Sequence, residues 1–60
     1  SVGSLIDLAQ EFEIIQKRGS WFSYDGSQLG QGRDATKTAL KEDEALYAEI
    51  EEKVKAKMAG

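Results

Sequence analysis

The chain has 60 residues, neither cysteine nor histidine, and a formal net charge of −3. A chain of this length is expected to form a single domain, 1–60, that buries only about 60% of its unfolded surface. The composition excludes disulfides, thiolate metal sites and histidine-based acid–base catalysis. No apolar run approaches the ~20 residues of a membrane span and no signal-peptide pattern occurs, so we expect no membrane partner. We also expect the isolated chain to be monomeric and cytoplasmic.

The first half of the chain predicts one helix followed by three short strands. Apolar residues at helical spacing predict a helix over about 5–12, with Ser4 as its N-cap. Alternating runs bounded by glycine then predict strands over 14–18, 20–24 and 27–30. Consecutive short strands of this kind are typical of an antiparallel meander.

The expected turns set the register of these strands. Asp25-Gly26 favours a two-residue type I′ turn, because both residue types tolerate positive φ. A loop at 25–26 places Phe22 opposite Leu29, and a second loop at 18–19 places Ile15 opposite Phe22. These three apolar residues then form one row across the sheet, which predicts its core face.

Two helices are predicted in the second half. Asp34 can cap a short helix that ends near Lys41, and Asp43 can cap the next one. In the last helix, apolar residues recur in four-residue steps, and this stripe is expected to pack on the sheet: Leu46, Ile50, Val54 and Met58. The predicted fold class is α+β, a small three-stranded antiparallel β-meander packed against an N-terminal helix and two C-terminal helices.

Three segments also carry a family resemblance. They are GSLIDL at 3–8, IIQKRGSWFSY at 14–24 and LGQGR at 29–33. In order and spacing they resemble the C-terminal domain of bacterial RecA recombinase over nearly the whole chain. The resemblance implies an accessory domain whose parent protein is a DNA-dependent ATPase using ATP and Mg, with roles in DNA recombination, DNA repair and the SOS response to DNA damage. It also implies a RecA-like core domain and filament neighbours as partners.

The fragment itself contains no assembled catalytic site. Gly30 and Gly32 lack the third glycine of a dinucleotide site, and no phosphate loop occurs. The serines have no histidine to activate them, and the paired carboxylates fall on predicted helix surfaces. We therefore expect no enzyme activity, no cofactor and no ATP binding in these residues.

Four cations in or beside the glycine-rich middle form the candidate DNA-binding site: Lys17, Arg18, Arg33 and Lys37. Arg33 follows Gly-Gln-Gly at a predicted helix start, where exposed N–H groups favour an anion such as phosphate. The resemblance implies that Lys17 and Arg33 contact double-stranded DNA. Arg18 and Lys37 are added because they lie nearby in the sequence, although the first could be only a turn residue and the second only a solubilising charge.

Other features of the sequence weaken or compete with this interpretation. Glu11 and Glu13 occupy positions where some RecA domains carry lysine, so we expect non-specific affinity no tighter than about 10⁻⁴–10⁻⁶ M. Trp21, predicted opposite Gly30, is either a ring covering bare backbone or a base-stacking platform. The alternative function is a protein-interaction or regulatory module that uses a Trp21/Tyr24 surface or the acidic last helix.

Overall fold

A computed structural model describes all residues 1–60 and contains three helices and one three-stranded sheet. In chain order the elements are α1 (Val2–Glu11), β1 (Ile15–Arg18), β2 (Trp21–Tyr24), β3 (Ser27–Gln31), α2 (Arg33–Glu42) and α3 (Glu44–Ala59). The strands pair antiparallel in the order β1-β2-β3. The predicted α+β meander with one N-terminal and two C-terminal helices is confirmed.

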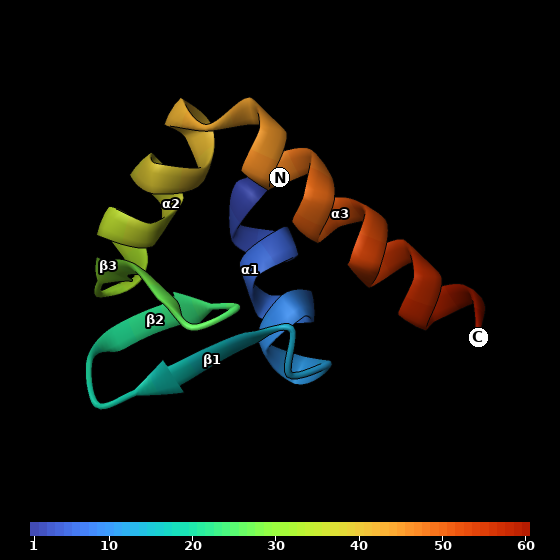
Figure 1. Cartoon of the computed structure of the whole chain (residues 1–60), viewed down its shortest axis with the longest axis horizontal. Helices are drawn as coiled ribbons and strands as arrows, with labels where there is room; N and C mark the ends of the chain where they lie inside the picture. Colours follow the sequence, from blue (N-terminus) through green and yellow to red (C-terminus); the bar gives the residue numbers. More distant parts are fainter.

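The helices lie on one side of the sheet (Figure 1). In this view α1 lies between the sheet and α3, and α2 rises from the β3 edge to the start of α3. The core between these layers consists of nine buried side chains: Leu5, Ile6, Ala9, Ile15, Phe22, Tyr24, Leu40, Ile50 and Val54. The other face of the sheet is left open to solvent.

Helix α1 begins earlier than predicted and ends in a left-handed turn. Its N-cap is Ser1, whose hydroxyl oxygen accepts from the Ser4 backbone N–H at 3.3 Å, so the prediction of Ser4 as the cap is wrong. At the other end, Glu13 has a φ of 61°, and the Ile14 N–H donates to the Ala9 carbonyl at 2.8 Å. This is the Schellman arrangement, in which a residue at positive φ turns the chain out of the helix. It directs the chain into β1.

The register between β1 and β2 differs by two residues from the prediction. Ile15 pairs with Tyr24 instead of Phe22, because the loop is Gly19-Ser20. Gly19 has a φ of 61° whereas Ser20 is not at positive φ, which fits the preference of type II′ turns for glycine in the first loop position. A shift of two residues leaves every side chain on its predicted face. Ile15 and Phe22 therefore both reach the core without lying directly opposite each other.

The turn between β2 and β3 forms as predicted, but a β-bulge follows it. Asp25 and Gly26 have φ values of 51° and 82°, both positive as a type I′ turn requires. The pairing shifts between Phe22 and Ser23, so that Phe22 lies opposite Gly30 and Leu29 is the extra residue. The predicted pairing of Phe22 with Leu29 is therefore wrong.

The bulge places Gly30 directly against α2. A Cβ at this position would lie 2.9 Å from both the Ala35 carbonyl carbon and the Thr36 nitrogen, so the two backbones approach as closely as only glycine allows. Trp21 lies opposite Gln31 and not Gly30, so the prediction that its ring covers Gly30 is wrong. Helix α2 covers that backbone instead.

The N-terminus of α2 is held differently from that of α3. Gly32 is the N-cap of α2 and provides no side-chain hydrogen bond, while Asp34 lies inside the first turn. The predicted Asp34 cap is therefore wrong. The predicted Asp43 cap of α3 is confirmed, because its carboxylate accepts from the Leu46 N–H at 3.1 Å.

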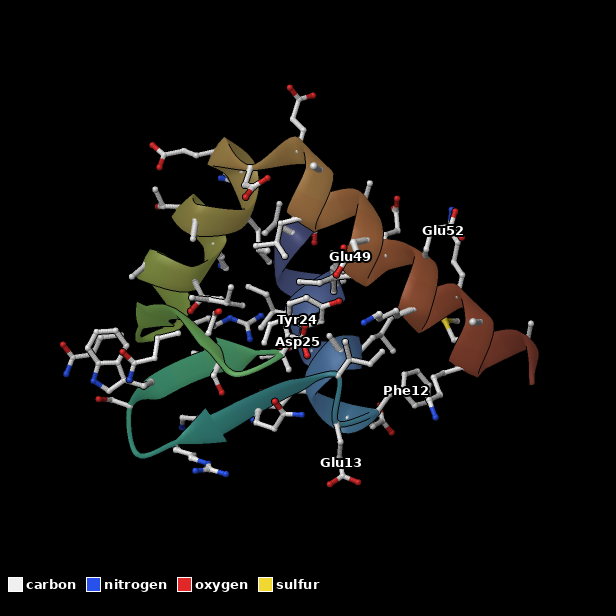
Figure 2. The ribbon with its side chains drawn as sticks, in the orientation of Figure 1. Phe12, Glu13, Tyr24, Asp25, Glu49 and Glu52 are labelled. Atoms are coloured by element: carbon white, nitrogen blue, oxygen red, sulfur yellow. The ribbon has the colours of Figure 1, made fainter.

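Helix α3 packs against α1 and α2. The buried residues of its apolar stripe also belong to the same core cluster as Ile15, Phe22 and Tyr24 of the sheet. Ile50 and Val54 of that stripe are buried, whereas Met58 is 62% exposed. Tyr24 of β2 is the side chain that reaches α3, where its hydroxyl donates to the Glu49 carboxylate (Figure 2). No helix is both long enough and apolar enough to cross a membrane.

Candidate nucleic-acid interface

Lys17 and Arg33 come from different elements and line the same hollow, which has a volume of about 400 Å³. Lys17 lies near the end of β1, opposite Phe22, and Arg33 is the first residue of α2. The Gly32 N–H donates to the Ser20 carbonyl at 2.6 Å, which ties the β1–β2 turn to the start of α2. Phe22 is the one hydrophobic residue in the lining. The remaining lining residues are polar or small: Gln10, Gly19, Ser20 and Gly32. The hollow is thus lined mostly by polar and small residues, two of which are cations.

A second hollow, of about 610 Å³, continues this surface along α2. Three cations line it, Arg33, Lys37 and Lys41, together with the start of α1 and Asp7. The cations recur every four residues, which places them on one face of α2. Lys41 was not among the predicted site residues, although this spacing could have identified it. Because Arg33 lines both hollows, they form one basic surface, defined here by Lys17, Arg33, Lys37 and Lys41.

The Arg33 guanidinium is held against α1 by an ion pair that the sequence did not reveal. It donates through Nη1 and Nη2 to the two carboxylate oxygens of Asp7, and through Nη2 to the Gly3 carbonyl at 3.2 Å. The hydrogen bonds from Arg33 lower the pKa of Asp7 below its ordinary value, and Asp7 in turn raises the pKa of Arg33. Both side chains stay largely exposed, so a phosphate can reach the guanidinium but has to compete with one carboxylate.

Backbone geometry favours an anion at the start of α2. No side chain caps this terminus, and the first N–H groups of a helix have no partner within it. These N–H groups and the helix dipole attract negative charge. The terminus lies between the two hollows, beside Arg33.

Arg18 does not belong to the basic surface. Neighbouring residues in a strand point to opposite faces of the sheet, so Arg18 points away from Lys17. It lines a separate hollow of about 320 Å³ together with Trp21 and residues of all three strands. Of the four predicted contacts, the structure brings together Lys17, Arg33 and Lys37, and it places Arg18 on the other face.

The predicted protein-interaction surface of Trp21 and Tyr24 is also split between the two faces of the sheet. Trp21 and Tyr24 lie three residues apart in β2 and therefore face opposite sides, so the predicted joint Trp21/Tyr24 surface is wrong. Tyr24 is buried, and its hydrogen bond to Glu49 raises its pKa. The Lys53 amine lies 4.8 Å from the centre of the Tyr24 ring, and Tyr24 raises the pKa of this amine. This cluster therefore joins β2 to α3.

The two acids expected to weaken DNA binding lie at the end of α1. Glu11 is the last residue of the helix and is exposed. Glu13 lies in the turn that follows, and its carboxylate points into solvent (Figure 2). No group of three or more acidic side chains is placed to hold a metal ion.

Comparison with known proteins gives a consistent family match. The family model described as the RecA C-terminal domain matches residues 3–59. The chain is 54% identical over 59 residues to Protein RecA of Chloroherpeton thalassium, an alignment that covers 98% of this chain and 16% of that protein. Protein RecA of Bifidobacterium breve is 54% identical over 54 residues, covering 90% of this chain and 14% of that protein. Protein RecA of Chlorobium chlorochromatii is 52% identical over 60 residues, covering 100% of this chain and 17% of that protein. The chain thus spans about a sixth of the length of these curated relatives.

Proposed function

Because the chain belongs to the RecA C-terminal domain family, we propose that it is an accessory domain that captures double-stranded DNA for a RecA-like recombinase. The parent protein would hydrolyse ATP with Mg through a core domain outside these residues, in the cytoplasm, during DNA recombination and repair. The 60 residues act as one domain that supplies a DNA surface and no catalytic group.

The observation that carries this proposal is the shared hollow of Lys17 and Arg33. Two cations from different elements line one hollow, and a backbone hydrogen bond from Gly32 to Ser20 links the β1–β2 turn to the start of α2. DNA presents one negative charge per ~1.7 Å of helix axis, so adjacent cations along one surface can meet successive phosphates. Lys37 and Lys41 extend the row along α2.

The chemistry of this surface fits contact with phosphates and does not require recognition of the DNA base sequence. Gly19 and Gly32 carry no side chains that would keep a phosphate away from the backbone, and the N-terminus of α2 offers N–H donors. Contacts to phosphate position a duplex but carry no sequence information. Neutralising between two and four phosphates gives a slope of log affinity against log salt between about −1.8 and −3.6.

An NMR titration with a short duplex tests the location of this surface. We expect amide shifts at residues 17–20 and 32–37, and loss of those shifts in Lys17→Glu and Lys37→Glu. The matched control is Lys55→Glu, which reverses an exposed cation on α3 and should change little. Shifts confined to α3, or equal damage from the control, would show that the surface is wrongly placed.

One observation favours a second function, contact with a neighbouring protein. An apolar hollow of about 330 Å³ lies between α1 and α3, with Leu8, Tyr47 and the exposed Met58 in its lining. Exposed apolar surface of this kind often marks a protein interface. The core domain or a filament neighbour would be the partner. Binding that persists at high salt and fails in Met58→Glu would identify this function, since phosphate contacts weaken steeply with salt.

A further inference from the structure

The face of the sheet that no helix covers is organised in two cross-strand rows. Pairing across the three strands aligns Gln16, Ser23 and Gln28 in one row, and Arg18, Trp21 and Gln31 in the other. Here these six residues are called the outer sheet face. They include an indole, a guanidinium, three amides and a hydroxyl, but no carboxylate. In a chain with a net charge of −3, this is an acid-free surface.

The β-bulge at Leu29 creates the second row. Without the extra residue, Trp21 would lie opposite Gly30, and the row would end on a position without a side chain. With it, Trp21 lies opposite Gln31, whose amide donates to the Ser20 hydroxyl at 3.1 Å. Bulges reorient side chains locally and are common next to functional sites. The bulge therefore fixes a polar group beside the indole.

Neither Trp21 nor Arg18 is used by the fold. Trp21 is 39% exposed, although a ring of this size usually contributes to the core. Arg18 forms no ion pair, since the only one in the chain joins Arg33 to Asp7, and it does not stack on the indole, since the only cation–π contact joins Lys53 to Tyr24. Both side chains line the same hollow of about 320 Å³. An aromatic face and an unpaired cation are thus available together.

We propose that the outer sheet face binds a single, unstacked strand of nucleic acid, independently of the duplex surface. One base stacks on the Trp21 indole, the Arg18 guanidinium contacts the adjacent phosphate, and the amide of Gln28 meets a base edge. Aromatic stacking combined with a cation is how proteins hold single strands of any sequence. A duplex does not fit this chemistry, because its bases are stacked inside the helix and one cation neutralises too few phosphates.

Fluorescence gives a direct test, because Trp21 is the only tryptophan. The 60-residue chain is titrated at low salt with a short oligothymidylate strand while its emission is followed. We expect saturable quenching, which Arg18→Gln weakens and Lys17→Gln, on the opposite face, leaves unchanged. A blunt duplex of equal length should leave the emission unchanged even where it binds Lys17 and Arg33. Absence of quenching, equal quenching by the duplex, or equal effects of the two substitutions would overturn the proposal.

A second variant measures the stacking contribution. Trp21→Leu, followed by anisotropy of a labelled strand, should lower affinity about 5- to 150-fold, the range measured for losing one stacked base. Circular dichroism checks that the variant is folded, as expected for a side chain on an open face. Unchanged affinity in a folded Trp21→Leu variant would overturn the proposal. Since duplex binding is measured separately, failure at one face is distinguishable from failure at the other.

Discussion

Replacing Gly30 with alanine tests how the sheet positions the basic surface. In an open strand Gly→Ala stabilises a protein by about 0.5–1 kcal/mol, because glycine loses more conformational freedom on folding. Here the new Cβ would lie 2.9 Å from the Ala35 carbonyl carbon and the Thr36 nitrogen. Carbon atoms pack best at about 3.5–4.0 Å, so α2 would have to move away by roughly 0.6–1.1 Å. Overpacking of this kind costs about 1–3 kcal/mol, so the sign of the effect is reversed.

Thermal unfolding followed by circular dichroism measures this cost. For a domain of this size each kcal/mol lowers Tm by about 4–8 °C, so the decrease should lie between roughly 4 and 24 °C. Gly3→Ala is the matched control, since the atom nearest to its new Cβ is the flexible end of the Arg33 side chain, and it should not destabilise the protein. A melting temperature of Gly30→Ala equal to or above that of the wild type would refute the close contact between β3 and α2.

Four further predictions concern three side chains, Phe22, Asp7 and Glu49. Phe22→Ala should cost about 3–5 kcal/mol, because the ring is only 4% exposed, and a thermal melt close to wild type would show that Phe22 is not in the core. Asp7→Asn should strengthen duplex binding in a titration, because Arg33 loses its competing carboxylate, and unchanged affinity would argue against Arg33 as a phosphate contact. Arg33 lowers the pKa of Asp7, so this ion pair stabilises the fold above about pH 4 and stabilises it less as the pH falls below that value. In Asp7→Asn the free energy of unfolding should therefore no longer decrease over this acid range through the ion pair. Glu49→Gln should lower the raised pKa of Tyr24, which an NMR pH titration of its ring resonances measures. The raised pKa means that stability is lost as the pH rises above about 10, and this loss should be smaller in Glu49→Gln.

The elements could be predicted from sequence because local signals define them, whereas the register could not. The type I′ turn at 25–26 depends on two residues that tolerate positive φ, and it forms as expected. The bulge at Leu29 accompanies a contact between Gly30 and α2, which joins residues of two elements. Nothing in the alternation of β3 marks it. The turn at Gly19 was misplaced because that glycine suits either position of a two-residue loop.

In the candidate site too, features set by neighbouring residues could be predicted from the sequence, whereas a contact between distant residues could not. Lys17 and Arg33 are predicted as site residues from their place beside the glycines and from the family resemblance, and the structure shows that they line one hollow. Asp7 could not be identified, because its partner Arg33 lies 26 positions away in the sequence. The sequence could have predicted that Arg18 and Lys17 lie on different faces of the sheet, since neighbours in a strand face opposite sides. The sequence could also have placed Lys41 on the same face as Arg33 and Lys37, because the three residues recur every four positions along α2.

The salt dependence of duplex affinity tests the central claim, phosphate capture by the basic surface, most directly. The wild-type chain should show a slope of log affinity against log salt between about −1.8 and −3.6, and Lys17→Gln should reduce its magnitude by about 0.9. Lys55→Gln removes the same charge from α3 and should lower affinity only slightly, without changing the slope. A slope near zero, or equal flattening by Lys55→Gln and Lys17→Gln, would contradict phosphate contact at Lys17.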